Sequence, residues 1–420
     1  MTTLAATRST PGWFTADDCR LEDFRAVVET TTALASARTT PGWFAPDDCR
    51  LEDFRAVVET TTDLADYPCA DEVRENVLVY GSRLRDSVAT PEGRRDVQAE
   101  LARALADGPG IVVFAGAFPD TAVVDRATAV FQAMIDEQNA AGVVGGDHFA
   151  KPGANDRVWG ALDKFAVRDP EAFAAYYGND VIALVSEAWL GRGYQVTSQV
   201  NVVNPGGQAQ VAHRDYHLGF MSKEQSQAYP AHVHRLSPVM TLQGAVAHCD
   251  MPVVTGPTMY LPHSQKYAPG YVAFHQPGFT AYFDGHFVQL PLRKGDAAFF
   301  NPALFHGAGT NRSADARRMA NLLQVSSAFG RAMESVDRTV MSVALYPALQ
   351  NFDGNVANVI AASAEGYAFP TNLDRDQPIG GLAPQTQAEL VAQALDEKWD
   401  VTTFEKALHD QQSRRRSGLR

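Results

Sequence analysis

The 420-residue chain has no stretch of about 18 consecutive apolar residues, which a membrane-spanning helix would require. Its first residues, MTTLAATRSTPGWF, also lack the apolar core of a secretory signal peptide. We therefore expect no membrane association and a cytoplasmic location.

Cysteine and basic charge are also scarce. The four cysteines (Cys19, Cys49, Cys69 and Cys249) form no C-x-x-C pair, which argues against a zinc site and a disulfide framework. The formal net charge is −13, and the only basic run is the tail at 413–420. Phosphate binding needs a clustered Lys/Arg face, so we expect no nucleic-acid partner.

The N-terminal region contains a tandem duplication. The segment TPGWFTADDCRLEDFRAVVETTT at 10–32 recurs at 40–62, with Ala45 in place of Thr15 and Pro46 in place of Ala16. Two copies are too few for a stacked repeat architecture. A recent duplication or an upstream start is the favoured interpretation, and a working paired element is the alternative. We assign residues 1–95 to an N-terminal extension whose repeat is expected to be dispensable for catalysis.

The rest of the chain suggests a β-rich domain followed by helices. After Gly193, short β-branched and aromatic runs are separated by Pro, Gly and Asn, at the spacing of a sandwich or barrel. We predict a mainly β fold with flanking helices, in which residues 96–330 form a jelly-roll, cupin-like core. Residues 331–420 are expected to form a mixed or helical C-terminal extension, with a capping box at 386–389.

Two short segments carry the residue types of a metal site. His213 and Asp215 are two residues apart, so on a strand both side chains point to one face and Arg214 points to the other. A second histidine, His306, ends an apolar strand in the block KGDAAFFNPALFHGAGTNRSADARR at 294–318. Two histidines and one carboxylate form the facial triad of non-haem iron(II) oxygenases.

The same block ends in a pair of arginines, Arg317 and Arg318. A guanidinium can hold a carboxylate through two parallel hydrogen bonds and keeps its charge in a partly dry pocket. Neighbours on a strand face opposite ways, so only one of the two should face the interior. The alternation of the following residues does not decide between them.

Over about residues 97–328 the sequence resembles the phytanoyl-CoA dioxygenase family. The matching pieces are ELARALADGPGIVVFAG, the H-x-D segment, CDMPVVTGPTMYLPHSQK, KGDAAFF and HGAGTN with the arginine pair. The resemblance implies a double-stranded β-helix that binds iron(II) through His213, Asp215 and His306, with 2-oxoglutarate as co-substrate and O2 as oxidant. In that family the arginine that binds 2-oxoglutarate lies eleven residues after the second histidine, which is Arg317 here.

Other polar and aromatic residues near these segments are candidates for the pocket wall. Gln199 and Asn201 lie on the strand that precedes the H-x-D segment, and they are expected to face the co-substrate unless they are ordinary polar strand residues. Tyr216 and His217 follow the ligand pair, and Trp159 lies in a Gly-rich loop. These three are expected to contact the substrate.

The function that this resemblance implies is hydroxylation of an unactivated C–H bond of a small molecule, with release of succinate and CO2. Desaturation, cyclisation and epoxidation remain open, because the same oxidant produces each of them. Asp215 argues against halogenation, which uses a small residue at that position. The rival interpretations are a non-catalytic jelly-roll ligand-binding protein and a metal hydrolase. The oligomeric state is left open.

Overall fold

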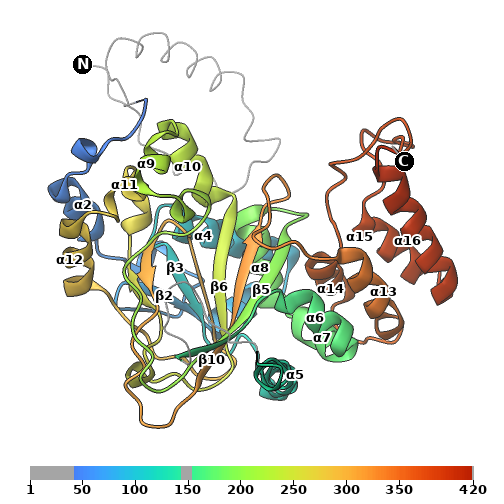
Figure 1. The fold of residues 1–420 in the computed structure, drawn as a ribbon, viewed down its shortest axis with the longest axis horizontal. Helices are drawn as coiled ribbons and strands as arrows, with labels where there is room; N and C mark the ends of the chain where they lie inside the picture. The colour runs from blue at the N-terminus through green and yellow to red at the C-terminus, as the bar shows by residue number, and fades with distance from the viewer. Residues whose placement is uncertain (1–41, 143–153, 419–420) are drawn as a thin grey trace.

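The computed structural model describes residues 42–142 and 154–418, and its centre is a large mixed sheet (Figure 1). The strands in chain order are β1 (Glu72–Arg74), β2 (Val77–Tyr80), β3 (Ile111–Phe114), β4 (Asn155–Val158), β5 (Gln195–Val203), β6 (Thr241–Ala247), β7 (Met259–Leu261), β8 (Ala297–Phe300), β9 (Phe305–Gly307) and β10 (Arg318–Ser326). The main sheet has the order β1-β2-β3-β8-β6-β10-β5-β4, and only β2 and β3 run parallel.

A smaller second layer faces this sheet. Strands β7 and β9 pair with each other, and single bridges extend the layer from Tyr260 to Val288 and from His306 to His213. A pocket lies between the layers, since residues of β5, β6, β8 and β10 line it together with residues of β7 and β9. The two-layer arrangement is the one expected of a jelly-roll core.

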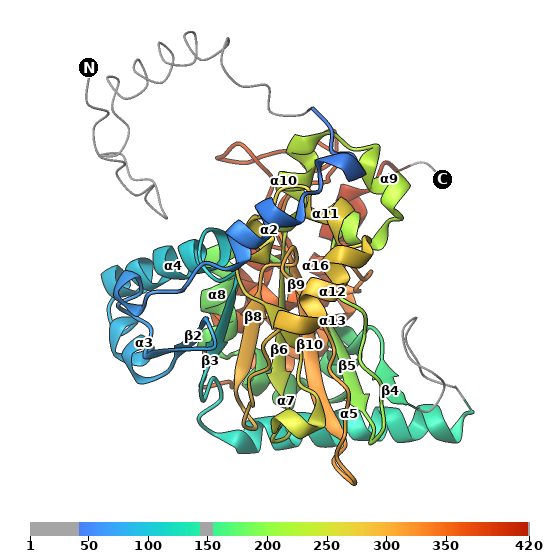
Figure 2. The ribbon, with the colours of Figure 1, turned by 90° about the vertical axis from the view of Figure 1, so that its left-hand side faces the viewer.

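Helices cover the outer side of the main sheet and both ends of the molecule (Figure 2). Those before β6 are α2 (Leu51–Val58), α3 (Ser82–Ser87), α4 (Pro91–Ala106), α5 (Thr121–Ala140), α6 (Ala161–Arg168), α7 (Pro170–Tyr177), α8 (Asp180–Leu190), α9 (Lys223–Gln227) and α10 (Ala231–Val239). Those after it are α11 (Gly270–Ala273), α12 (Pro277–His286), α13 (Arg338–Leu349), α14 (Val356–Ser363), α15 (Gln387–Asp396) and α16 (Val401–Arg415). Helices make up 45% of the described residues and strands 15%, so the expectation of a mainly β protein is not confirmed.

Both faces of the central strands are buried, and this decides which side chains reach the pocket. On β5, Val200 and Val202 pack into the core formed with the outer helices, whereas Gln199 and Asn201 line the pocket. On β10, Leu323 and Val325 join the same outer core. Successive side chains of a strand point to opposite faces, so every second residue of β5 and β10 is available to a ligand.

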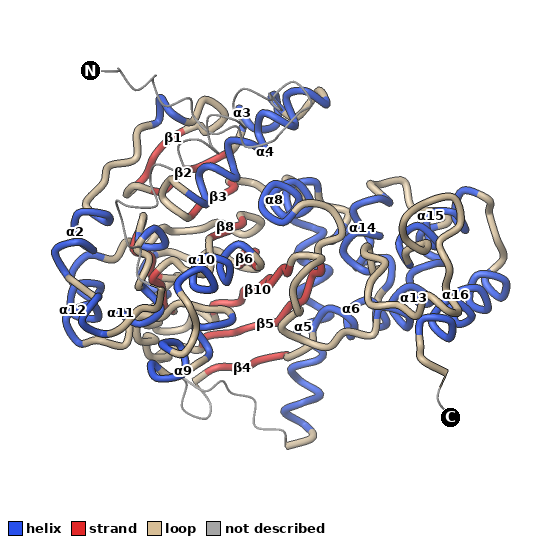
Figure 3. Tube along the Cα trace, turned by 90° about the horizontal axis from the view of Figure 1, so that it is seen from above, coloured by secondary structure: helices blue, strands red, loops and turns tan. Residues whose placement is uncertain are grey.

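The predicted division into three parts does not coincide with breaks in the fold. The boundary at residue 95 falls inside α4, and β1 and β2 before it belong to the main sheet. The C-terminal helices α13–α16 share one hydrophobic core with α5–α8. Figure 3 shows helices α13–α16 together at the end of the molecule opposite α2, α11 and α12. The capping box at Thr386 and Glu389 is present at the start of α15.

The structure describes residues of only the second copy of the repeat. The first copy, 10–32, lies outside the described residues. In the second copy, Phe54 on α2 is fully buried among the rings of Tyr267, Phe279 and Phe305. Side chains of the second copy thus complete part of the hydrophobic core, while the dispensability of the repeat for catalysis stays a prediction. None of the helices in the described ranges is long and apolar enough to cross a membrane.

Truncation distinguishes the two copies. A chain without residues 1–38 should keep the free energy of unfolding of the full chain, because every contact of Phe54 remains. A chain without residues 1–62 should lose at least about 3–5 kcal/mol, the usual cost of deleting a buried phenylalanine ring. Urea unfolding followed by fluorescence measures both values, and equal stability of the two truncated chains would contradict the assignment of α2 to the core.

Candidate metal centre

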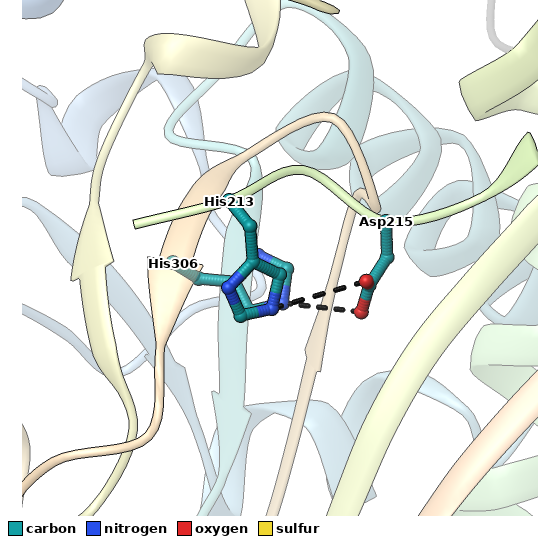
Figure 4. A group of neighbouring side chains, drawn as sticks. All are labelled: His213, Asp215 and His306. Carbon is teal, nitrogen blue, oxygen red and sulfur yellow. Dashed lines mark ion pairs between the residues drawn. The ribbon is translucent and has the colours of Figure 1, made fainter. Parts of the chain in front are cut away.

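Three side chains with metal-binding atoms come together (Figure 4), and all three line the pocket. Nε2 of His213 lies 3.8 Å from Oδ1 of Asp215, and Nε2 of His306 lies 3.4 Å from Oδ2 of the same carboxylate. One ligand atom from each of the three residues falls within 4.8 Å of the others. The described ranges contain no other group of three such residues at this spacing.

Backbone pairing holds the three residues in place. The amide of His213 donates to the carbonyl of His306 at 3.0 Å, and the reverse bond is 3.1 Å long. The amide of Asp215 donates to the carbonyl of Pro302 at 2.9 Å. The H-x-D segment is therefore fixed to the strand that supplies the second histidine, although the two are about ninety residues apart in the sequence.

Each histidine is held in one tautomer by its own chain. Nδ1 of His213 lies 2.8 Å from the carbonyl oxygen of Val211, and Nδ1 of His306 lies 2.8 Å from that of Leu304. A carbonyl can only accept, so both Nδ1 atoms carry the proton. Nε2 of each ring then has the lone pair that a metal ion needs, and outer hydrogen bonds of this kind also orient a metal-binding imidazole.

The carboxylate between the two rings is ionised. Burial acts to raise the pKa of the Asp215 carboxyl, but the nearby imidazoles of His213 and His306 hold the pKa well below its usual range. The amide Nε2 of Gln243 on β6 also donates to Oδ2 of Asp215. Two imidazoles and an anionic oxygen form a donor set that suits a divalent first-row metal.

Arg214 points away from the metal centre, as alternation predicted. It is almost fully buried, and its guanidinium lies 5.1 Å from the ring centroids of both Tyr271 and Phe305. It donates to the carbonyls of Ser264 at 2.6 Å and Tyr267 at 3.0 Å. Burial lowers the pKa of Arg214 to about 10, which still leaves it charged at neutral pH. The side chain between the two ligands thus anchors their backbone from behind.

Gly270 provides the space for this anchor. A Cβ atom at residue 270 would overlap the guanidinium carbon of Arg214. We expect Gly270→Ala to lower the free energy of unfolding by about 1–3 kcal/mol, the usual cost of overpacking. Gly278→Ala on α12 is the matched control, because its Cβ would meet nothing within 4 Å and alanine favours a helix. Equal denaturant midpoints for the two variants would contradict the role of Gly270.

The metal centre opens into a cavity of about 230 Å³ between the two sheets. Arg318 lines this cavity from β10, with only 7% of its surface exposed. Within the described ranges its guanidinium makes no hydrogen bond or ion pair. Burial lowers the pKa of Arg318 to about 10, so the side chain remains a cation inside the pocket. A buried cation without a partner is costly unless a ligand supplies the anion.

The choice of Arg317 as the inward arginine is corrected by this arrangement. Arg317 points outward with 47% of its side chain exposed, and it donates to Asp156 at 2.9 Å and Asn204 at 3.2 Å. Counting eleven residues from His306 selects the outward-facing neighbour, because the turn between β9 and β10 places residue 318 on the pocket face. The residue pattern along β10 could not show which arginine faces the pocket, because helices bury the other face of the strand as well.

The two predicted polar residues of β5 both line the pocket. Oε1 of Gln199 accepts from Arg157 at 2.8 Å, and its Nε2 donates to Oε1 of Gln324 at 3.1 Å. The buried Oδ1 of Asn201 has no hydrogen-bond partner among the described residues. Asn201 therefore offers an unused acceptor to a ligand, whereas Gln199 is part of a network of side chains.

The three predicted substrate residues lie in different places. Trp159 lines the mouth of the pocket, where the guanidinium of Arg157 lies 4.3 Å from its ring centroid. Tyr216 is buried behind the wall and donates to Sδ of Met333 at 3.0 Å. His217 does not line the pocket. Burial lowers the pKa of His217, and its backbone amide donates to Ser237.

Gln243 and Met333 are among the pocket residues that sequence reasoning missed. Gln243 contacts the carboxylate of Asp215 from β6, and Met333 lines the pocket from the segment that follows β10. Strand alternation could have identified Gln243 once the register of β6 was known. No pattern in the sequence marks Met333, because its position depends on how the segment leading to α13 crosses the pocket.

A family model described as phytanoyl-CoA dioxygenase matches residues 105–319. A comparison with curated protein sequences found no match.

Among solved structures, the chain is similar to the non-haem alpha-ketoglutarate-dependent epimerase SnoN from nogalamycin biosynthesis, at 19% identity and a TM-score of 0.37 over 57% of this chain and 82% of that one. It is similar to the carbocyclase SnoK from the same biosynthesis at 19% identity and a TM-score of 0.38, covering 54% and 83%. HygX from Streptomyces hygroscopicus, solved with nickel and 2-oxoglutarate, is 13% identical with a TM-score of 0.36, covering 55% and 88%.

Proposed function

The chain belongs to the phytanoyl-CoA dioxygenase family, and from that premise we propose that it is an iron(II)- and 2-oxoglutarate-dependent oxygenase that hydroxylates an unactivated C–H bond of a small molecule. The observation that carries the proposal is the convergence of His213, Asp215 and His306 on one point of the pocket wall. Iron(II) bound there would supply, with 2-oxoglutarate and O2, oxidation of a C–H bond with release of succinate and CO2.

The residues present fit that cofactor. Two imidazoles with fixed tautomers and one ionised carboxylate occupy one side of the candidate position, which leaves the pocket side for other ligands. Gln243 keeps the carboxylate in its orientation by hydrogen bonding to Oδ2. The protein contributes position and charge at this centre.

Arg318 is the residue that we assign to the distal carboxylate of 2-oxoglutarate. It is buried, cationic and without a partner in the described ranges, and it lies in the same cavity as the metal-binding residues. A planar guanidinium can hold a carboxylate through two charge-assisted hydrogen bonds. Asn201 on the neighbouring strand offers its free Oδ1 in the same cavity, and we assign it a secondary contact with a bound ligand.

The substrate is assigned to the other end of the cavity. Gln199, Gln324 and Met333 form its wall there, and Trp159 stands at the mouth. A cavity of about 230 Å³ with an open mouth fits a small molecule or one end of a larger molecule. Desaturation, cyclisation and epoxidation remain alternatives to hydroxylation, because the pose of the substrate decides among them. Asp215 argues against halogenation.

Anaerobic titration with iron(II) and 2-oxoglutarate tests the proposal. An oxygenase of this kind should bind one iron per chain and develop a visible charge-transfer band when 2-oxoglutarate is added. On exposure to O2 it should form succinate, faster when a substrate is present. A non-catalytic ligand-binding protein would show neither the band nor succinate, and that result would reject the proposal.

A further inference from the structure

The second repeat copy fills a groove directly behind the metal centre. This aromatic groove consists of Tyr267, Phe279, Tyr282 and Phe305, and the ring of Phe54 lies 5.0–5.7 Å from the four ring centroids. Phe305 precedes a metal-binding residue, and the carbonyl of Tyr267 accepts from the anchor Arg214. The groove therefore connects the repeat to the backbone that holds the site.

Most of the polar contacts of the docked copy involve only its backbone. The amide of Arg50 donates to the hydroxyl of Tyr267 at 2.8 Å, and that hydroxyl donates back to the Arg50 carbonyl at 3.1 Å. The carbonyl of Gly42 accepts from Ala231 at 2.8 Å, and that of Pro46 accepts from Gln276 at 3.3 Å. A second segment with the same buried side chains could make each of these bonds.

The first copy has those side chains. It carries Phe24 at the position of Phe54 in the docked copy. The two copies differ only at Thr15/Ala45 and Ala16/Pro46. Ala45 is exposed, and Pro46 contributes its carbonyl oxygen to the contact with Gln276. Neither difference removes a side chain on which the docking depends.

We propose that residues 10–32 are a second docking segment for the aromatic groove, able to replace residues 40–62 within the same chain. Docking of the first copy requires residues 33–62 to loop out between Thr32 and Asp63. Closing such a loop costs conformational entropy, so the second copy occupies the groove in the intact chain. The first copy takes over when the second is weakened, which makes the support of the metal centre redundant.

Cysteine alkylation reports which copy is docked, because Cys19 and Cys49 are equivalent positions in the two copies. The docked Cys49 is partly buried, with its thiol 3.8 Å from the carbonyl of Pro269. Burial raises the pKa of the Cys49 thiol to about 11, which slows its reaction with iodoacetamide. Trypsin releases STPGWFTADDCR at 9–20 and TTPGWFAPDDCR at 39–50, which mass spectrometry separates.

The full-length chain is compared with Phe54→Ala, the matched variant Phe24→Ala and the double variant. In wild type and Phe24→Ala, Cys49 should react at least about tenfold more slowly than Cys19. In Phe54→Ala the order should reverse, with a melting temperature close to that of wild type. The double variant should leave both thiols reactive and lower the melting temperature strongly.

Several outcomes would overturn the proposal. Unchanged rapid labelling of Cys19 in Phe54→Ala, or failure of that variant to fold, would show that the first copy does not replace the second. Reversal that appears only in dimers at high protein concentration would reject exchange within one chain. As an independent check, a chain lacking residues 33–62 should fold and protect Cys19, and loss of folding there would refute the equivalence of the copies.

Discussion

Asp215→Ala is expected to abolish binding of iron(II) and with it all 2-oxoglutarate turnover, while the protein stays folded. The variant removes the only carboxylate ligand of the proposed site and leaves the two imidazoles. The loss of metal affinity should exceed the roughly 10–100-fold that removal of an outer hydrogen-bond partner usually costs. His213→Ala and His306→Ala should behave alike. Iron titration measures the binding, and circular dichroism checks that the fold is retained.

His217→Ala is the matched control for these variants. It removes an imidazole two residues from Asp215. That ring does not line the pocket, and its Nδ1 lies 3.4 Å from the hydroxyl of Ser237. We expect iron affinity within a few-fold of the wild type. If His217→Ala loses iron as severely as Asp215→Ala, or if any of the three ligand variants retains full affinity, the assigned ligand set is wrong.

Arg318→Ala should raise the dissociation constant for 2-oxoglutarate by about ten- to a hundred-fold. A charge-assisted bidentate contact is worth roughly 1.5–3 kcal/mol, and the variant removes the buried cation that we assign to the distal carboxylate. Arg318→Lys should restore only part of the affinity, because an ammonium group lacks the planar fork. Titration of the anaerobic iron(II) enzyme with 2-oxoglutarate measures each constant.

Arg317→Ala is the control for the arginine assignment. Its exposed ion pair with Asp156 is of a kind that contributes about 0–1 kcal/mol, so the affinity for 2-oxoglutarate should change little. The opposite pattern, with Arg317→Ala weakening 2-oxoglutarate and Arg318→Ala not, would restore the register expected from the sequence. That result would contradict the side-chain positions along β10.

The pairing of His213 with Asp215, and the distant His306, could be identified from the sequence because metal chemistry restricts residue type and spacing. The two-residue separation also predicted correctly that Arg214 points away from the site. The arginine could not be chosen in the same way. Both faces of β10 are buried, so polar and apolar residues do not alternate along it, and a count from His306 is sensitive to one extra residue in a turn.

The fold was predictable where local patterns are strong and less so where tertiary packing decides. The short β-branched runs after Gly193 indicated the strands, and the capping box at Thr386 indicated a helix. The amount of helix was underestimated. The helices that cover the outer face of the sheet share one core with it, and the sequence pattern did not show that packing. The role of α2 was missed, since nothing local shows that Phe54 finds an aromatic groove more than two hundred residues away.

Met333 lines the pocket from a segment of the chain that is separate from the three proposed iron ligands. The proposed iron ligands lie on β9 and the H-x-D segment, whereas Met333 belongs to the stretch that leads from β10 into the C-terminal helices. Its sulfur accepts from Tyr216 at 3.0 Å and from Gln199 at 3.5 Å, so a change in residues 331–337 alters the wall without touching a ligand. On the proposed function, we therefore expect changes in this stretch to alter the substrate range while the three proposed iron ligands stay in place.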